Sequence, residues 1–202
     1  MQVFGMVEEV FFATGNEGKI KEMRPLFRDR KIELRQVDVD VPEIDAMDVE
    51  KVAERKVRDS FEKALSKDLV DEDDLLIVED TGFYVEGLNG FPGPEAAFFS
   101  RTVGVDKLPT LMNSVDDRSA YFKTAIAVKN QNQVKVFTGK LEGKVPENSR
   151  GESHDHLPYN SYFIPDGRDS SLAENSMHSD ENFHRTEAVI KFLENYIGAS
   201  TR

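Results

Sequence analysis

The 202-residue chain contains no cysteine. The missing thiols exclude disulfide bridges, thiol catalysis and thiolate metal sites. Basic residues are also few: 26 Lys and Arg stand against 38 Asp and Glu, which gives a formal net charge of -12. Because a surface this negative repels DNA, RNA and anionic lipid, we expect neither a nucleic-acid polymer nor a membrane as partner. The charge does not exclude one small anion held in a locally positive pocket.

Long apolar runs are absent from the sequence too. No run is long enough to span a bilayer, and the opening MQVFGMVEEVFF lacks the basic start and continuous apolar core of a signal peptide. We therefore expect a cytoplasmic protein. With 39% hydrophobic and 32% charged residues, the composition is that of a globular protein able to bury a sizeable core. The length fits one domain over residues 1–202, or one domain with two lobes around a cleft.

Hydrophobic periodicity predicts strands that alternate with helices. In chain order we expect a strand at Val10–Ala13, a helix from Glu17 that Pro25 kinks or ends, a strand at Ile32–Val39, a helix at Val49–Leu65, a buried strand at Leu75–Val78, a hairpin with its tip at Asn130–Gln133, and a last helix at about Asp180–Ile197 with Ser179 as candidate N-cap. The sequence LNGFPGPE and the polar stretch Pro146–Ser171 are expected to be loops. This order predicts a mixed α/β sheet.

The first expected strand leads into the sequence ATGNEGKIKEM, which has features of a phosphate-binding loop. Only two residues separate Gly15 from the Gly18–Lys19 pair, whereas a Walker A loop has four, so a P-loop NTPase is excluded. The start of the helix still gathers backbone N–H groups, a hydroxyl, an amide and a cation, from Thr14, Gly15, Asn16 and Lys19. These groups suit an anion site at a helix N-terminus. They equally suit a structural turn with a solvated lysine.

The apolar run LLIV is followed by Glu79, Asp80 and Thr81. Open α/β sheets place their chemistry at the carboxyl ends of strands, which favours a site here. Because adjacent strand residues point to opposite faces, one carboxylate could bind a metal while the other accepts a proton. Asp-Thr-Gly also occurs in aspartic proteases, but these need two such carboxylates and the chain has one copy. The remaining alternative is that the acidic pair only caps a turn.

A second acidic pair, Glu43 and Asp45, follows the strand expected at residues 32–39. Mg²⁺ prefers a few carboxylates together with water and substrate phosphate oxygens. Glu43 with Glu79 or Asp80 would supply them, although acidic residues in a loop are usually just solvated. Lys56, on the polar side of the second expected helix, is in the same way more often a surface lysine than a phosphate ligand.

Five motifs, in their order and spacing, resemble the Ham1/inosine triphosphate pyrophosphatase family: FFATGNEGKIKEM, VPE, VEDTGFYVEGLNGFPGP, FIPDG and FHRTEA. The resemblance covers nearly the whole chain, and the first and third motifs are its more specific part. It implies an elongated mixed α/β sheet with two lobes around a central cleft, usually in a homodimer. It also implies Mg²⁺-dependent hydrolysis of non-standard purine nucleoside triphosphates (ITP, dITP, XTP) to the monophosphate and pyrophosphate.

The resemblance further implies a role for each matched residue. The substrate would be bound by Thr14, Gly15, Asn16, Lys19, Lys56, Thr81, Tyr159, Asn160, His184 and Arg185. The metal would be bound by Glu43, Glu79 and Asp80, and Asp80 would activate the attacking water. Tyr159 would stack on the base. Donors from His184 and Arg185, aimed at a 6-keto oxygen, would reject adenine, whose 6-amino group is itself a donor.

The sequence departs from the family pattern in the base pocket and the phosphate clamp. Asn160 stands where the family has Asp, and Leu157 and Pro158 replace an aromatic residue and a glycine. Phe183 replaces a serine, and two expected basic residues are missing, one after PGP and one between Glu174 and Phe183. The candidates to replace their charge are Arg101, Arg150 and Arg168.

We therefore expect Mg²⁺-dependent pyrophosphohydrolysis with altered or relaxed base choice. Two alternatives stay open at this point. One is a related pyrophosphatase of the Maf type with another base preference. The other is a nucleotide-binding protein whose lost cations leave binding with little turnover.

Overall fold

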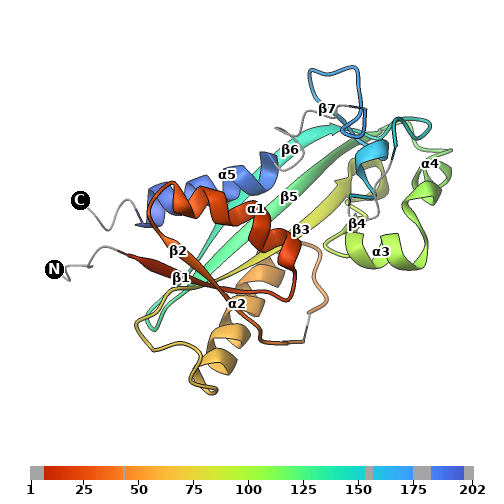
Figure 1. Ribbon diagram of the computed structural model, residues 1–202. Helices are drawn as coiled ribbons and strands as arrows, with labels where there is room; N and C mark the ends of the chain where they lie inside the picture. Colours follow the sequence, from red (N-terminus) through yellow and green to blue (C-terminus); the bar gives the residue numbers. More distant parts are fainter. Residues whose placement is uncertain (1–6, 43, 153–156, 175–182, 198–202) are drawn as a thin grey trace. The chain divides into compact units, whose positions relative to one another are not determined.

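The computed structural model describes residues 7–42, 44–152, 157–174 and 183–197 (Figure 1). The strands are β1 (Glu9–Ala13), β2 (Glu33–Val37), β3 (Leu76–Val85), β4 (Pro92–Gly93), β5 (Ser119–Lys129), β6 (Val134–Lys144) and β7 (Ile164–Pro165). The helices are α1 (Glu17–Arg28), α2 (Val49–Leu65), α3 (Ala96–Thr102), α4 (Leu108–Leu111) and α5 (Phe183–Phe192), and a π-helical turn (Leu193–Ile197) follows α5.

All seven strands belong to one sheet with the order β2-β1-β3-β5-β6-β7, and β4 pairs with β3 beside this path. β1 runs parallel to β2 and to β3, whereas β4 is antiparallel to β3 and β7 is antiparallel to β6. The hairpin of β5 and β6 turns at residues 130–133, as predicted, and the Asn130 side chain closes the turn by accepting from the N–H groups of Asn132 and Gln133. The sheet is therefore mixed, and the predicted fold class is confirmed.

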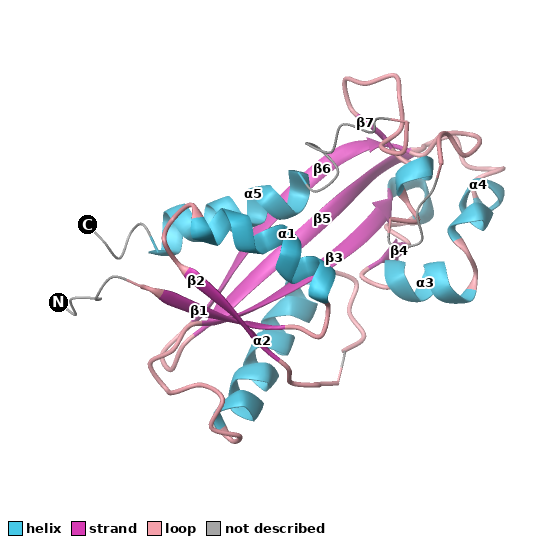
Figure 2. Cartoon of the chain, in the orientation of Figure 1, coloured by secondary structure: helices cyan, strands magenta, loops and turns pink. Residues whose placement is uncertain are grey.

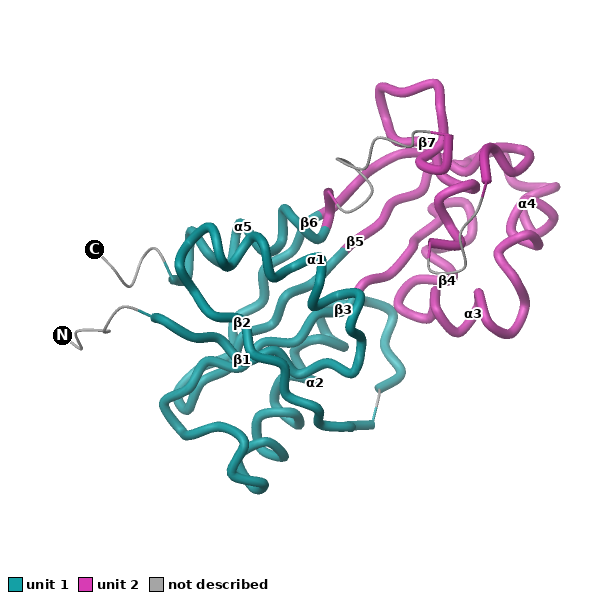
Figure 3. The backbone as a smooth tube through the Cα atoms, in the orientation of Figure 1, with its two compact units in different colours: residues 1–80, 124–139, 185–202 teal, residues 81–123, 140–184 magenta. Residues whose placement is uncertain are grey.

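The chain divides into two compact units (Figure 3). Each unit has its own hydrophobic core. Unit 1 comprises residues 1–80, 124–139 and 185–202, and unit 2 comprises residues 81–123 and 140–184. β3 therefore passes from unit 1 to unit 2 after Asp80, and α5 passes back after His184.

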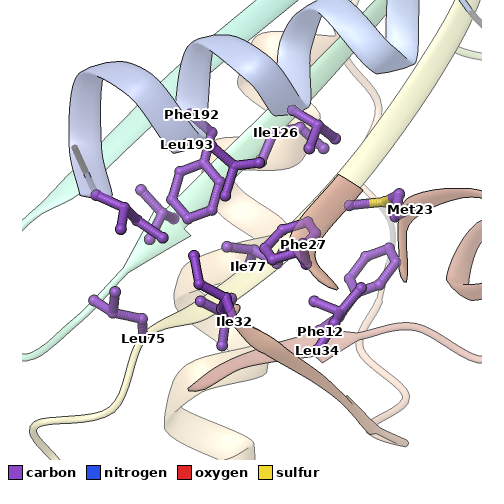
Figure 4. Close-up of a cluster of buried hydrophobic side chains, with 14 of the residues drawn as sticks. Phe12, Met23, Phe27, Ile32, Leu34, Leu75, Ile77, Ile126, Phe192 and Leu193 are labelled. Carbon is purple, nitrogen blue, oxygen red and sulfur yellow. The ribbon is translucent and has the colours of Figure 1, made fainter. Parts of the chain in front are cut away.

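In unit 1, α1 and α5 cover one face of the sheet and α2 covers the other (Figure 2). On the first face, strand residues Phe12, Ile77 and Ile126 pack against α1 and the C-terminal helix (Figure 4). In unit 2, the core gathers around aromatic side chains that approach one another closely, namely Phe83, Phe122, Tyr159 and Phe163.

Two expected boundaries were wrong, and two short strands lie in stretches that were expected to be loops: β4 in LNGFPGPE and β7 in Pro146–Ser171. α1 does not end at Pro25 but continues to Arg28, because the buried side chains of Met23 and Phe27 hold the helix in the core on both sides of the proline. Proline removes one helical hydrogen bond, whose acceptor would be the carbonyl of Lys21, and Lys21 is exposed, so water can satisfy that carbonyl.

The strand expected at Leu75–Val78 is longer than predicted, and the acidic pair lies inside it rather than at its end. β3 pairs with β1 at Leu76 and Ile77 and with β4 at Phe83 and Tyr84. Between these pairings, β3 runs beyond the end of β1. Residues 79–81 in this part are polar, so they interrupt the hydrophobic pattern. The pattern therefore did not predict that the strand continues.

The other elements agree with the prediction more closely. The helix at Val49–Leu65 has its predicted bounds, and the first strand has one residue more than expected. β2 covers the middle of the strand expected at Ile32–Val39. The last helix is found from Phe183 onward, while its expected start and its candidate cap Ser179 lie outside the described residues.

Candidate functional site

In unit 1, the turn between β1 and α1 is shaped by its own side chains. Asn16 is the N-cap of α1, and its side-chain oxygen accepts from the N–H groups of Gly18 at 2.9 Å and Lys19 at 3.3 Å. The hydroxyl of Thr14 accepts from the N–H of Asn16 at 3.1 Å. Part of this motif is therefore structural, because capping by Asn stabilises the start of a helix.

The two glycines of the turn have different reasons to be glycine. A Cβ atom on Gly18 would lie 3.0 Å from the capping oxygen of Asn16, so the cap itself favours glycine there. A Cβ atom on Gly15 would meet only Asp38, at an ordinary 3.9 Å, and Gly15 is not among the residues with positive φ. Neither packing nor backbone conformation explains Gly15. A ligand that approaches the backbone would require it.

Four charged side chains meet beside this turn, and we call them the Glu79 cluster: Lys19, Glu22, Glu79 and Arg185. The Lys19 ammonium contacts the Glu79 carboxylate and also lies 3.3 Å from the Glu79 backbone carbonyl. The Arg185 Nε donates to Glu79 Oε1 at 3.2 Å, while its Nη1 pairs with Glu22. α1 contributes two members of the cluster, β3 contributes one and α5 contributes one.

The cluster is buried around its central carboxylate. The side chain of Glu79 is 0% exposed, that of Arg185 is 12% exposed and that of Lys19 is 23% exposed. A buried carboxylate is costly unless cations and hydrogen-bond donors surround it, and Glu79 has two cations. Burial lowers the pKa of Arg185, but the charges of Glu79 and Glu22 raise it by more, so the net pKa lies above its usual range. The guanidinium therefore stays charged.

Glu79 and Asp80 serve different faces of the sheet. Glu79 lies on the face of Ile77, which α1 and α5 cover. Alternation along β3 places Asp80 on the opposite face, which α2 covers, and the partly buried Lys56 belongs to α2. The two carboxylates can therefore have separate roles.

The other predicted substrate residues belong to unit 2, whose aromatic core contains two of them. The Tyr159 ring lies 4.7 Å from that of Phe83, and its hydroxyl donates to the carbonyl of Ala96 at 2.7 Å. Burial raises the pKa of Tyr159. His184 is 3% exposed and stacks on Phe122, with ring centroids 5.1 Å apart. Thr81, the first residue of unit 2, is partly buried on β3.

Hydrogen bonds hold the stretch around Asn160 to two other segments of unit 2. The Asn160 carbonyl accepts from the N–H of Ala173 at 3.1 Å, and the next carbonyl accepts from the N–H of Arg150 at 2.8 Å. The Arg150 side chain binds Glu174, with Nε 3.1 Å from Oε2. Among the three candidate replacements for the missing cations, Arg150 is partly buried and binds a carboxylate. Arg101 and Arg168 are exposed.

Glu174 provides a test of this connection, because its pKa is lowered by the N–H of Ser171 and by Arg150. A carboxylate whose pKa is lowered in the folded state stabilises the fold at pH values above the ordinary glutamate pKa. This stabilisation is lost as the pH falls through the lowered pKa. We expect Glu174→Gln to reduce the free energy of unfolding at pH 7 and to match the wild type at acid pH, in urea titrations at several pH values. Glu152→Gln, at an exposed site, should show no such trend. A deficit that is independent of pH would contradict this interpretation.

Two residues near the predicted sites were missed by sequence reasoning. Glu22 binds Arg185, and its position three residues after Lys19 on α1 puts both on one helix face, which was a usable signal. Phe122 supports His184, but within β5 it is one apolar residue among many and gives no signal.

The carboxylates here fit a hard cation accompanied by other ligands. In the described ranges, no group of three or more acidic or histidine side chains could hold a metal ion, and Glu43 lies outside those ranges. Mg²⁺ commonly takes one or two protein carboxylates and completes its shell with water and phosphate oxygens. Because Glu79 and Asp80 lie on opposite faces of β3, each could supply one such carboxylate to Mg²⁺ that is bound together with a polyphosphate. The helices of the described segments include none that is long and apolar enough to cross a membrane.

The strand–turn–helix motif and the adjacent carboxylate pair define a mixed α/β protein with a candidate anion site at the N-terminus of α1. A sequence profile of the Ham1 family matches residues 10–195. The chain belongs to the Ham1 family.

Its relatives include the dITP/XTP pyrophosphatase of Methanopyrus kandleri, with 34% identity over 93% of this chain and 96% of that protein. The dITP/XTP pyrophosphatase of Thermococcus kodakarensis is 31% identical over 90% of this chain and 93% of that protein. Among solved structures, the Staphylococcus aureus Ham1 protein is similar with a TM-score of 0.75 and 25% identity, over 95% of this chain and 98% of that one.

Proposed function

We propose that this protein hydrolyses non-standard purine nucleoside triphosphates, such as dITP, ITP and XTP, to the monophosphate and pyrophosphate with the help of Mg²⁺. Membership of the Ham1 family and relatives with the name dITP/XTP pyrophosphatase support the proposal. The observation that carries it is the contact of Lys19, at the start of α1, with Glu79, next to Asp80 on β3. This contact joins a cation and a capped helix start to one carboxylate, Glu79, while Asp80 follows it on the opposite face of β3.

The turn before α1 and its lysine would bind the triphosphate. Helix N-termini favour anions, and Lys19 and Lys56 would neutralise part of the substrate charge. Thr14 and Asn16 would keep the turn in shape through their present hydrogen bonds, and Gly15 would let the phosphates approach the backbone. Hydrolysis of a triphosphate is slow largely because the substrate repels the nucleophile, so neutralisation favours the reaction.

Asp80 would act as general base and orient the attacking water, with Thr81 beside it. When bound, Mg²⁺ would neutralise phosphate charge and fix the phosphate geometry, held by Glu43 together with Glu79 or Asp80. The side chain of Glu79 currently contacts Lys19 and Arg185, so its use as a ligand requires these contacts to change.

The base would be recognised by Tyr159, Asn160, His184 and Arg185. Tyr159 is 6% exposed, so stacking on a base requires the ring to move or the loop around it to open. We further propose a cytoplasmic homodimer that acts on nucleotides rather than on nucleic-acid polymers. The net charge of -12 favours a nucleotide over a nucleic-acid polymer as the substrate, because a polymer would be repelled more strongly.

A nucleotide-binding protein with weak turnover is the second candidate. The missing basic residues near the phosphates favour it, because Arg150, one candidate to replace them, binds Glu174.

The direct test is release of pyrophosphate from ITP, dITP, XTP, ATP and GTP with Mg²⁺. We expect the three non-standard nucleotides to react about tenfold or more faster than ATP, since unpaired donors in the base pocket penalise adenine. EDTA should abolish the reaction. Equal rates for all five would refute the base selectivity, and no release from any of them by folded protein would refute the enzyme.

A further inference from the structure

The Glu79 cluster uses the same groups that the proposed reaction would need for substrate and metal. Lys19 is a proposed phosphate ligand, Glu79 is a proposed metal ligand, and the two contact each other. Arg185 holds the other oxygen of the same carboxylate, with Nε 3.2 Å from Oε1. Both oxygens of Glu79 therefore face cations of the protein.

We infer that Lys19 and Arg185 keep divalent metal ions off Glu79 until a polyphosphate draws Lys19 away, so that the protein binds metal weakly by itself and well only with its anionic substrate. The inference rests on the proposed function for the identity of that substrate. The proposed step is that Lys19 leaves Glu79 and binds the polyphosphate. Its effect on metal affinity can be measured without turnover.

Charge balance supports this order of binding. Within the cluster, Lys19 and Arg185 balance the charges of Glu22 and Glu79, so these four groups carry no net negative charge that would attract a divalent cation. If a triphosphate binds the Lys19 ammonium, the buried carboxylate of Glu79 loses one of its two cations in the cluster, and a buried charge with less compensation is costly. A divalent ion that arrives with the phosphates would replace the lysine. By thermodynamic linkage, metal and polyphosphate then raise each other's affinity by the same factor.

The geometry indicates that Lys19 leaves Glu79 when the polyphosphate binds, whereas Arg185 stays beside Glu79. Arg185 is held at two points, by Glu79 and Glu22, and is 12% exposed. Lys19 is 23% exposed, and its side chain is a flexible stem with a single charged end. Its donors go to the carboxylate and the backbone carbonyl of the same residue, Glu79. Within the cluster, a movement of Lys19 therefore breaks contacts with Glu79 alone.

The test is a titration of the nucleotide-free protein with Mn²⁺, in which free Mn²⁺ is followed by its EPR signal. We expect weak binding by the wild type and about tenfold or more tighter binding by Lys19→Met, because a neighbouring cation changes the proton affinity of a carboxylate by about one to three orders of magnitude. Arg185→Met should act in the same direction. The double variant Lys19→Met/Glu79→Gln should return to weak binding.

Lys21→Met is the matched control, since Lys21 is an exposed lysine of the same helix and its loss changes the net charge equally. Equal Mn²⁺ affinity in the Lys19 and Lys21 variants would overturn the inference, as would tight Mn²⁺ binding by the wild type. Circular dichroism would establish that each variant is folded. If Mn²⁺ follows the expected pattern but no nucleotide releases pyrophosphate, the proposed function fails and the inference about the cluster stands.

Discussion

Asp80→Asn is expected to lower the rate of pyrophosphate release from dITP by about 10²- to 10⁴-fold, which is the usual contribution of a general base. The amide keeps the size of the side chain but no longer accepts a proton from water. It also weakens any metal bond at this position. Because the phosphate-binding turn and Lys19 are unchanged, nucleotide affinity should fall far less than turnover. The rate is measured as pyrophosphate released under saturating dITP and Mg²⁺, and affinity is measured by calorimetry.

Asp73→Asn is the control, since Asp73 is exposed in the turn before β3 and the variant has the same charge change. It should retain the wild-type rate. A loss of turnover in Asp73→Asn similar to that in Asp80→Asn would assign the effect to net charge. Normal turnover in Asp80→Asn would remove Asp80 from the mechanism. If the wild type binds dITP but hardly turns it over, and Asp80→Asn changes little, the weakly catalytic binding protein is the better description.

Local patterns predicted those elements whose signals lie within their own stretch of sequence. The helix at Val49–Leu65 has one apolar face and a capping residue, Asp48, whose side chain accepts from the N–H of Glu50 at 3.0 Å. Both signals are readable in the sequence. β3 was misjudged because its continuation depends on the strands beside it, which are β1 and then β4, together with its other neighbour β5. No local pattern records which strand will lie alongside, so polar residues in a strand appeared to be its end.

The site shows the same division. The residue types of the turn before α1 predicted its cap region, but their partners were not predictable. The contact of Lys19 with Glu79 joins residues 60 positions apart, and that of Arg185 with Glu22 joins residues 163 positions apart. Such pairs exist only once the sheet brings α1, β3 and α5 together. Sequence reasoning could therefore name charged residues for substrate and metal, but could not show that these residues neutralise one another.

Phe192→Ala is expected to reduce the free energy of unfolding by about 3–5 kcal/mol, the usual cost of removing a buried aromatic side chain. The Phe192 ring is fully buried in the core of unit 1, on the same side as Phe27 (Figure 4). Its ring centroid lies 6.0 Å from that of Phe27 and 5.8 Å from that of Phe137. These neighbours belong to α1 and β6, which are packed elements of regular structure. They therefore cannot move far enough to fill the cavity that the substitution leaves.

Phe183→Ala removes the same side chain at the start of the same helix, where it is 48% exposed, and should change stability by about 0.5 kcal/mol or less. Urea denaturation measures both variants. Because α5 also carries Arg185, the loosened packing of Phe192→Ala should weaken the hold of Arg185 on Glu79, and Mn²⁺ should bind this variant more tightly than it binds Phe183→Ala. Equal stability of the two variants would show that α5 does not anchor the core of unit 1. The packing of α5 would then not explain how Arg185 is held beside Glu79.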